Sequence, residues 1–599
     1  MKPVSVTSVA GTAGVLLEAK QGKKEKSKEK EEEEEEEKDY WKDVQFDWEH
    51  FEEVQNFVRV NYIDPATSED RAFAEACNFA LLGLNKPVML LPTKFYKKRK
   101  GHEDEEGALD GKARKFGKRS DLTLVSFKEA EEAEEDEEEP RKRLTDDEIR
   151  DTRERFKKRQ ALLEETWTEI SFGRDDLNFC LAEGRRLGMK DEDQKREELG
   201  RDLLLWAAQG LLRSLDPHSA IVSAKAWEES TQKTTDASFD GIGAILTQRD
   251  GQTMIENPIE GQPAYGAGLR SGDVIVKVDG KSIKGLPLGK VVQQIRGPKN
   301  TEVVLTVRRE GEPKDLEVPI TRAYIEIQNV QSRMVKGHPD VGYIKLTGFV
   351  PTSTAKLRQA IQKLSSETVK GSLRGLILDL RNNSGGLLQQ AVKISDLFIA
   401  SGDIVSVRDR LRGGRGDKVY TATKDGTYDM PLVILVNDSS ASASEIVAGA
   451  VQDNGRGLVI GERTFGKASV QTLFNSHLGA KDYYIKLTVA RYYAPSGRTI
   501  QVVGIQPDKE VVPVFNEPMP LGFREENLGK HLSAIKTTYD SRNKGVMLKL
   551  DPCVASRGKA ERMYKANPNP QIRFDYQLMK GADYLECLVD KDSLGIGSP

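Results

Sequence analysis

The sequence predicts a multi-domain α/β protein, and three observations lead to this prediction. At 599 residues the chain is too long to fold around one hydrophobic core. Between residues 341 and 451, short apolar runs alternate with amphipathic helical patterns, which is typical of an α/β layer. A stretch of short strands and glycine turns precedes this layer, and helical patterns dominate before that stretch.

The composition argues against several classes of partner. Charged residues make up 31% and hydrophobic residues 37% of the chain, as in a soluble protein with strongly solvated stretches. The net charge is only -4, so the overall charge does not favour nucleic acid binding. No run approaches the ~18 apolar residues that a transmembrane helix needs. We therefore expect neither a nucleic-acid partner nor a membrane span.

The four cysteines lie far apart in the sequence and lack the C-x-x-C spacing of zinc and redox sites. This spacing leads us to expect no metal and no cofactor. Buried free thiols are the favoured interpretation of Cys77, Cys180, Cys553 and Cys587, with a disulfide between the last two as the alternative.

Residues 1–43 are expected to form a charged tail. Residues 23–38 are almost wholly Lys and Glu, and such a segment cannot bury enough apolar surface to fold on itself. The apolar stretch of residues 3–17 weakly resembles a secretory signal peptide, although its many Ser, Thr and Gly residues fit that role poorly. A disordered tail or a misplaced start is an equal alternative.

A helical N-terminal domain is expected over residues 44–235. The apolar residues of 51–58 recur at helical spacing, and residues 203–212 form a second apolar face. Thr145 and Glu148 form a capping-box pattern that marks the start of a further helix.

A low-complexity insertion interrupts this domain at about residues 97–143. It carries a basic patch at residues 97–100 and an acidic block at residues 131–139. We interpret it as mostly disordered and its charges as solvated, because this is the usual reading of a charge run, with binding of partners as the alternative.

The stretch over residues 236–325 resembles a PDZ domain. The pattern G-L-x-x-G-D-x-I begins at Gly268 and is followed by V-x-G, a helical stretch and a strand. A PDZ domain binds an extended peptide as an added strand and captures its terminal carboxylate with backbone N–H groups. The resemblance assigns that loop to Gly241, Ile242 and Gly243, although an isolated G-x-G would more simply shape a β-turn.

Two strand-to-helix junctions of the α/β layer stand out, because chemistry in such layers gathers where strands end. Residues 379–386 read Asp-Leu-Arg-Asn-Asn-Ser-Gly-Gly, and residues 437–445 carry serines at alternate positions before a helix. A serine at a helix N-terminus lies beside free N–H groups that can stabilise an oxyanion. On capping preferences alone, a helix cap is the simpler interpretation. None of the six histidines lies in a recognisable triad motif, which leaves room for a lysine as the base of a nucleophilic serine.

These motifs resemble the carboxy-terminal processing (tail-specific) serine peptidases of family S41, over roughly residues 200–510. The likeness implies a crotonase/ClpP-like αβ protease core over residues 326–514 with an inserted PDZ domain, and a C-terminal extension of unknown role over residues 515–599. The matching runs are Leu-Asp-Pro-His-Ser at 215–219, the PDZ-like module, the turn at 379–386, Ser-Ala-Ser-Ala-Ser-Glu-Ile from residue 440, the run at 461–471 that ends in Gly-Lys-Ala-Ser-Val-Gln, and residues 492–501.

The resemblance makes Ser442 the nucleophile, Lys467 the general base and Gln471 the group that orients the lysine. The spacing of 25 positions between serine and lysine fits the family for Ser442 only, so we interpret Ser440 and Ser444 as helix caps. Lys467 and Gln471 would share one face if their segment were helical.

Other site roles follow from the same resemblance. The oxyanion hole would combine the N–H of Ala443 with one from Gly385 or Gly386. Asp453 occupies the place of a supporting acidic residue, with a solvated helix-end aspartate as an equal alternative. Arg296 is a candidate relay from the PDZ domain, although closing a helix before Gly-Pro is at least as good an interpretation.

Lys467 can act as a base only when it is neutral. A lysine with a pKa near ~10.4 is protonated at neutral pH, so burial would have to lower its pKa by ~3 or more. Phe465 and Val470 could supply apolar surroundings, and Gln471 could hydrogen-bond the amine without adding a negative charge.

The expected function is a serine endopeptidase that binds protein C-termini through its PDZ domain and cleaves peptide bonds through an acyl-enzyme on Ser442. The resemblance implies substrates with unstructured apolar C-termini and an exported, periplasmic location, with a cytoplasmic one as the alternative. An adaptor partner and a dimer are left open. The alternative function is a catalytically inactive PDZ scaffold or adaptor on the same fold, and a ligand-binding crotonase-like protein is disfavoured by the PDZ-like insertion.

Overall fold

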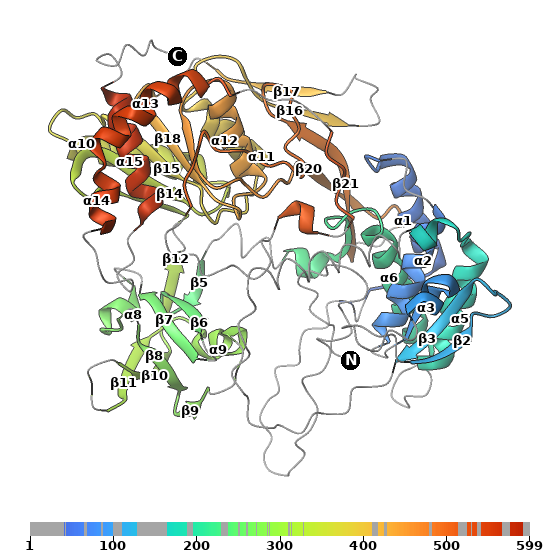
Figure 1. Cartoon of the computed structure of the whole chain (residues 1–599). Coiled ribbons are helices and arrows are strands. Elements are labelled where there is room, and N and C mark those ends of the chain that lie inside the picture. The colour runs from blue at the N-terminus through green and yellow to red at the C-terminus, as the bar shows by residue number, and fades with distance from the viewer. Residues whose placement is uncertain are drawn as a thin grey trace. The chain divides into compact units, whose positions relative to one another are not determined.

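The computed structural model contains two compact units. One comprises the described residues within 228–331, and the other comprises the described residues before and after that stretch (Figure 1). The structure describes residues 41, 44–64, 69–84, 88–99, 111–127, 165–188, 196–228, 238–249, 252–258, 262–270, 272–283, 286, 288–309, 312, 314–326, 329–409, 417–423, 428–478, 482–512, 524–528, 530–535, 541–565 and 575–590.

The N-terminal part is mainly helical, as predicted. The apolar pattern of residues 51–58 lies in α1 (Trp48–Asn61), where Phe51, Val54 and Phe57 are buried. Asp47 begins the helix, because its side chain accepts the His50 N–H at 3.1 Å.

The second predicted apolar face belongs to α6 (Arg196–Arg213). Together with α1 it packs into one hydrophobic core that also includes residues of β21 (Tyr483–Tyr493). Strand β4 (Ala220–Ser223) follows α6 and pairs with β21. The N-terminal helices therefore share their core with a strand that lies near the candidate site.

The prediction that the insertion at residues 97–143 is mostly disordered is wrong for part of it. Strands β2 (Gly111–Lys115) and β3 (Leu122–Phe127) pair with each other, and β3 pairs with β1 (Val88–Pro92). The apolar residues of β3 are buried, so a short hydrophobic strand inside a charged stretch is enough to build a sheet. Helix α3 (Thr93–Arg99) follows β1. The acidic block and the capping pair Thr145 and Glu148 lie outside the described residues, as does the tail up to residue 40.

The expectation of free thiols is also wrong. Cys77 in α2 (Glu69–Gly83) and Cys180 in α5 (Arg174–Gly188) form a buried disulfide, with a Cα–Cα distance of 5.8 Å. Packing of the two helices brings these cysteines within the range that a disulfide requires. Their separation of 103 residues carries no spacing cue.

The predicted alternation of strands and helices is confirmed after residue 330. Six strands form one sheet in the order β13-β14-β15-β18-β19-β22, and the pairs from β14 to β22 are parallel. In chain order the elements are β13 (Val330–Val335), β14 (His338–Leu346), α10 (Ser353–Glu367), β15 (Gly375–Asp379), α11 (Leu388–Asp396), β18 (Leu432–Val436), α12 (Ala443–Asp453), β19 (Leu458–Gly461) and β22 (Lys509–Glu510).

A second sheet is built from strands that come before or between those of the parallel sheet in the sequence. It has the order β17-β16-β21-β20, and β4 pairs with β21. Its remaining strands are β16 (Asp403–Asp409), β17 (Lys418–Thr421) and β20 (Ser469–Asn475).

The C-terminal extension covers one face of the parallel sheet. Ile377, Val433 and Leu435 pack in one core cluster with residues of α13 (Lys544–Arg557) and α15 (Tyr576–Val589), shown in red in Figure 1. Helix α14 (Lys559–Lys565) lies between them in the chain. Strand residues alternate between faces, so Leu376 and Leu378 point to the opposite side.

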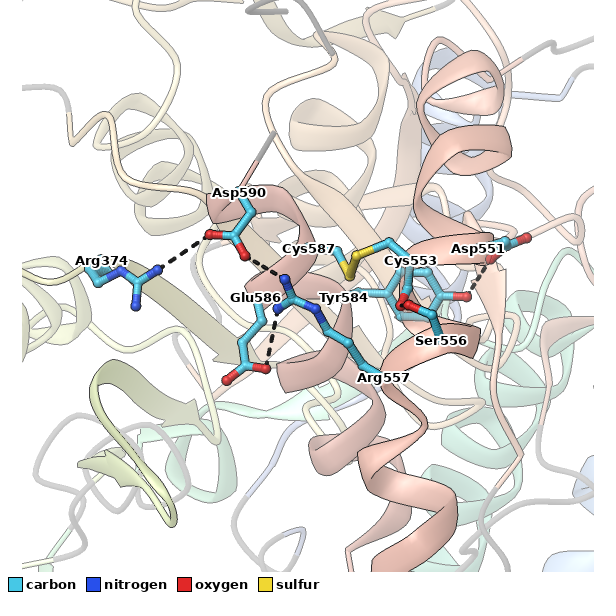
Figure 2. Close-up of a disulfide and its surroundings, with 9 residues drawn as sticks. All are labelled: Arg374, Asp551, Cys553, Ser556, Arg557, Tyr584, Glu586, Cys587 and Asp590. Carbon is cyan, nitrogen blue, oxygen red and sulfur yellow. Dashed lines mark hydrogen bonds and ion pairs between the residues drawn. A yellow bond between two sulfur atoms is a disulfide. The ribbon is translucent and has the colours of Figure 1, made fainter. Parts of the chain in front are cut away.

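A disulfide joins two of these helices, as the alternative reading of Cys553 and Cys587 predicted (Figure 2). Its Cα–Cα distance is 6.2 Å. Nearby, Tyr584 donates its hydroxyl hydrogen to Asp551 at 2.5 Å, which ties the same two helices together.

In the second unit a helix and then a strand follow the V-x-G pattern along the chain, as predicted for the PDZ-like module. Its sheet runs β11-β10-β8-β7-β6, with β9 on β8, and strands β5 and β12 form a separate pair. The elements are β5 (Ser238–Gly241), β6 (Ala244–Arg249), β7 (Gln252–Pro258), α8 (Pro263–Gly266), β8 (Val274–Val278), β9 (Lys281–Ser282), α9 (Leu288–Ile295), β10 (Glu302–Arg308), β11 (Leu316–Thr321) and β12 (Ala323–Glu326).

Among the helices in these described ranges, none is both long and apolar enough to cross a membrane.

Candidate active site

Ser442 lies at a strained turn between β18 and α12. Its φ of 55° and ψ of -112° fall in a region that side chains other than glycine rarely adopt. Helix α12 begins at the next residue, Ala443, so the serine lies at the positive end of the helix. Strain of this kind persists only where the surrounding structure holds the residue, which here is done by hydrogen bonds on both sides.

The interpretation of Ser440 and Ser444 as helix caps is wrong. The Ser440 hydroxyl donates to the carbonyl of Leu380 at 2.8 Å, and the Ser444 hydroxyl donates to the carbonyl of Asn383 at 2.8 Å. Both acceptors belong to the turn that follows the neighbouring strand β15. The alternating serines therefore fasten the two strand-to-helix junctions together.

Asn383 organises the glycine turn beside Ser442. Its carbonyl accepts the Ala441 N–H at 3.0 Å, and its side-chain oxygen accepts the Gly385 N–H at 2.9 Å. Gly385 approaches closely, because a Cβ atom there would lie 2.9 Å from the Cβ of Ser442. Within the described part of the chain, no acceptor is found for the N–H of Gly386.

Glu445 connects the serine and lysine segments, and the sequence analysis did not assign it a role. One of its carboxylate oxygens accepts the Ser442 N–H at 2.8 Å and the Lys467 N–H at 2.9 Å. The other accepts the Thr464 hydroxyl at 2.6 Å and the Gly466 N–H at 2.7 Å. Burial raises the pKa of Glu445 to about 7, although these hydrogen bonds oppose the shift. Glu445 could have been found from the sequence, because it lies three residues after Ser442, as the glutamate of a capping box does.

Lys467 lies in the loop that leads into β20. Desolvation lowers the pKa of its side chain, and the nearby ammonium of Lys486 lowers it further. The carboxylates of Glu525, Asp216 and Glu445 act in the opposite direction. The net lowering of the pKa is the direction that a general base requires.

The surroundings of Lys467 differ from the expected apolar shell. Phe465 and Val470 are only partly buried, and charged side chains also act on the lysine. The Tyr492 hydroxyl donates to the Lys467 carbonyl and contacts the side chain of Ser442.

Gln471 lies in strand β20, so the conditional helix over residues 467–471 does not form. Its amide donates to the hydroxyl of Ser469 at 2.9 Å and to that of Thr488 at 3.1 Å. Among the hydrogen bonds of the described residues, none joins Gln471 to Lys467. Ser469, which begins β20, thus links the Gln471 amide to the residue two positions after Lys467 in the chain.

Asp453 lies at the opposite end of α12 from Ser442. A helix rises ~1.5 Å per residue, so these eleven residues separate the two by about 16 Å. The Asp453 carboxylate is buried and accepts hydrogen bonds from Ser496 at 2.6 Å and from Arg498 at 2.9 Å. The solvated alternative is therefore wrong, and the residue supports the fold of the following segment.

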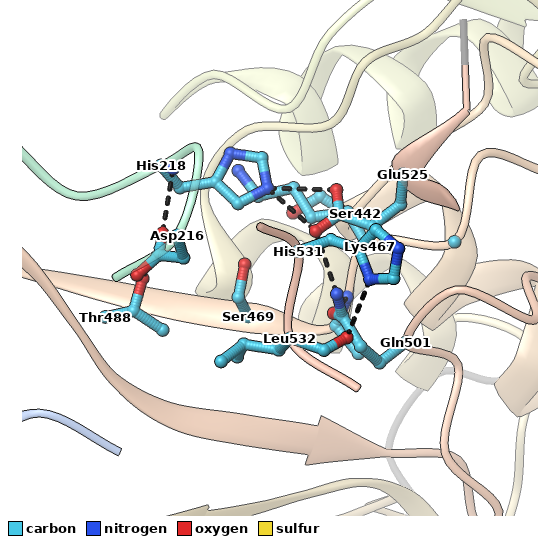
Figure 3. Close-up of polar contacts among 12 residues, drawn as sticks. Asp216, His218, Ser442, Lys467, Ser469, Thr488, Gln501, Glu525, His531 and Leu532 are labelled. Atoms are coloured by element: carbon cyan, nitrogen blue, oxygen red, sulfur yellow. Dashed lines mark hydrogen bonds and ion pairs between the residues drawn. The ribbon is translucent and has the colours of Figure 1, made fainter. Parts of the chain in front are cut away.

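His218 and Glu525 form a pair beside the lysine that sequence reasoning missed. The His218 Nε2 atom lies 2.9 Å from a Glu525 oxygen, and Figure 3 shows both near Ser442 and Lys467. They are 307 residues apart, so no local pattern links them. Among the described residues, no cluster of His, Cys, Asp or Glu is suited to hold a metal ion.

The PDZ-like unit has a groove at the edge of its sheet. Strand β6 is the last strand of that sheet, and Gly243 just before it has a φ of 71°. The carbonyl of Ile242 accepts the Ala264 N–H at 2.8 Å, which fixes the loop. Arg296 follows α9, and its N–H donates to the Val292 carbonyl. A cavity of about 170 Å³ between β6 and α9 is lined by Ile242, Gly243, Ala244, Leu246, Val292, Ile295 and Arg296.

Two regions of the chain are similar to known protein families. Residues 340–511 match the model of peptidase family S41, and residues 254–309 match a PDZ domain model. A solved PDZ domain of the carboxy-terminal protease of Vibrio cholerae, in complex with peptide, is 38% identical, covers 15% of this chain and 99% of its own, and has a TM-score of 0.14.

Two curated relatives carry the comparison further. The carboxy-terminal-processing protease of Bartonella bacilliformis is 40% identical over 320 residues, which cover 53% of this chain and 70% of the relative. The carboxy-terminal processing protease CtpA of Bacillus subtilis is 38% identical over 305 residues, which cover 50% of this chain and 62% of the relative. The chain therefore belongs to peptidase family S41, among the carboxy-terminal processing proteases that contain a PDZ domain.

Proposed function

We propose that this protein is a serine endopeptidase in which Ser442 is the nucleophile and Lys467 the general base. The observation that carries the proposal is the shared Glu445 oxygen, which accepts the N–H groups of both residues. The two backbones are thereby held side by side, with the lysine side chain desolvated. The shared acceptor for the two backbones and the lowered pKa of the amine support transfer of a proton from Ser442 to Lys467.

The reaction follows from these positions. Neutral Lys467 takes the proton of Ser442 as the serine oxygen attacks the substrate carbonyl. The amine then returns this proton to the leaving nitrogen as the peptide bond breaks, and an acyl-enzyme remains on Ser442. Water, deprotonated by the same lysine, hydrolyses the ester and restores the free enzyme.

We propose the N–H groups of Ala443 and Gly386 as the oxyanion hole. The Gly385 N–H already donates to Asn383, whereas no acceptor is found for the Gly386 N–H among the described residues, and Gly386 directly follows the glycine that approaches Ser442. Ala443 is the first residue of α12, where backbone N–H groups have no partner within the helix. Gln471 would orient the lysine indirectly, through Ser469.

The PDZ-like groove would select the substrate tail. Its apolar lining suits an apolar C-terminal residue, and the free edge of β6 can accept an added strand. The N–H groups of residues 241–243 would hold the terminal carboxylate, and Arg296 lies at the same groove. We further propose a crotonase/ClpP-like core, which the parallel strands with alternating helices support.

We also propose an exported, periplasmic location. The structure contains two disulfides, each of which joins two helices, and structural disulfides form and persist in oxidising compartments.

The test follows cleavage of an unfolded protein that carries an apolar C-terminal tail. Ser442→Ala and Lys467→Ala should each lower kcat by at least ~1,000-fold, while Ser440→Ala should keep most of the activity. Activity that survives in Lys467→Ala would refute the dyad. Tail binding by the wild type without any cleavage would favour the inactive scaffold.

A further inference from the structure

The lysine loop is anchored by a segment that lies outside the matched peptidase region. We propose that Glu525 is a positioning residue for Lys467, acting through the backbone on both sides of that residue. The inference rests on the proposed role of Lys467 as the base. Glu525 begins the short helix η1 (Glu525–Asn527), whereas the family match ends at residue 511.

Glu525 reaches the loop directly on one side of the lysine. Its backbone N–H donates to the Phe465 carbonyl at 3.1 Å. On the other side the link runs through Gln501, whose amide donates to a Glu525 oxygen at 2.8 Å. The oxygen of the same Gln501 side chain accepts the Ala468 N–H at 2.9 Å. One residue therefore fixes the backbone two positions before and one position after Lys467.

The Glu525 carboxylate is completely buried, and such a group persists only when it is well paired. Besides Gln501, it contacts His218 Nε2 at 2.9 and 3.1 Å (Figure 3). Asp216 in turn accepts the backbone N–H of His218 at 2.8 Å. The carboxylate is thus held from the loop after α6 as well as from the lysine side.

The segment that carries Glu525 is also anchored at its far end. Lys530 forms an ion pair with the buried Glu75 of α2 at 2.7 Å, and Leu532 is buried in the N-terminal core. The Arg491 side chain donates to the carbonyl of Ser533 at 3.3 Å. These contacts give residue 525 a defined place relative to the loop.

Because Glu525 is charged, its replacement should change the pH dependence of kcat. A residue that only stabilises the fold would not have this effect. Around Lys467, the cation of Lys486 on β21 lowers its pKa, whereas Glu525, Asp216 and Glu445 raise it. Neutralising Glu525 removes one of the raising charges, so the pKa of Lys467 falls further. Because the neutral lysine is the active form, the rise of kcat with pH then occurs at lower pH.

The experiment compares Glu525→Gln with the wild type and with Glu526→Gln as the matched control. Glu526 is the next residue, and its ion pair with Arg463 at 2.5 Å is partly exposed. We would measure kcat, KM and the rate of Ser442 labelling by a fluorophosphonate from pH about 5 to 10, together with thermal unfolding.

At high pH, where Lys467 is neutral in both proteins, Glu525→Gln should lower kcat by about 10-fold, because the substitution weakens the contacts of the carboxylate with Gln501 and His218. It should also move the acid limb of kcat and of labelling to lower pH and leave KM within about twofold. Glu526→Gln should match the wild type. Glu525→Asp, which keeps the charge but shortens the side chain, should lower kcat without moving the acid limb.

Three results would overturn the inference: wild-type kcat in Glu525→Gln, an equal loss at every pH with an unmoved acid limb, or loss of the folded state. The last two would make Glu525 merely structural. None of these results touches the proposed function, which fails separately if Lys467→Ala remains active.

Discussion

The two halves of the candidate site are built in different ways. The Ser442 half consists of two junctions that follow neighbouring parallel strands, β15 and β18, and that are fastened by Ser440, Ser444 and Asn383. The Lys467 half is a loop held from other parts of the chain by the side chains of Glu445 and Gln501 and by the backbone N–H of Glu525.

This difference shows which half depends on the sheet and which depends on buried polar contacts. Adjacent parallel strands end at the same edge, so the nucleophile and the glycine turn meet wherever the sheet forms. The lysine loop has no such template, and its position requires every partner of a buried network. We therefore expect mutations in the network to change chemistry, and mutations around the sheet to change mainly stability.

The largest effect should come from breaking the link between the halves. Glu445→Ala leaves the N–H groups of Ser442, Gly466 and Lys467 without their acceptor, and we expect kcat to fall by about 1,000- to 10,000-fold. The measurement is cleavage of the tailed substrate, with circular dichroism to check folding. A folded variant with near-normal kcat would show that the two halves hold their places independently.

Removing the two disulfides one at a time should show how each part of the chain contributes to the stability of the protein. Cys77–Cys180 spans 103 residues in the N-terminal part, and Cys553–Cys587 spans 34 residues in the helices on the sheet. From loop length, their removal as paired Cys→Ser variants should cost about 4–5 and about 3–4 kcal/mol of unfolding free energy.

Denaturant unfolding with activity measured on the folded fraction provides the check. The first variant should also lower activity, because Lys530 and Leu532 join the segment of Glu525 to that N-terminal part. Equal activity of both variants would contradict the comparison.

The pH dependence of stability should carry a contribution from Glu445. Its pKa is raised from 4.5 to about 7 in the folded state, so the folded protein binds this proton more tightly than the unfolded chain. The resulting stability is present below pH 4.5 and is lost as the pH rises toward 7, at about 1.4 kcal/mol per pH unit. The difference between wild type and Glu445→Gln in urea unfolding isolates this contribution. A difference that does not vary with pH would contradict the assignment.

The smallest effect is expected from the contact between the C-terminal extension and the glycine turn. Arg381 binds both Asp575 oxygens, at 2.8 and 2.7 Å, and also pairs with the buried Asp379. Asp575→Ala should lower the unfolding free energy by about 1–3 kcal/mol, because Arg381 loses a partner in a mostly buried place. The kcat of the folded protein should change by less than about threefold. A larger loss of kcat without loss of stability would show that the Ser442 half also depends on buried polar contacts.

Much of the fold could be predicted because it depends on local patterns. The apolar runs of β15 and β18 and the amphipathic faces of α1 and α6 are periodic, and such patterns survive in any tertiary context. Ser442 and Lys467 could be proposed because their motifs are short and close to each other in sequence.

The tertiary structure alone decided the contacts between distant segments. The pairing of Cys77 with Cys180, of His218 with Glu525, and of Ser440 with the glycine turn leaves no trace in spacing. Each depends on how helices and strands pack, and packing is set by the whole core rather than by neighbouring residues. The sequence thus determined which residues carry the candidate chemistry, and the packing of the chain decided what holds the lysine in place.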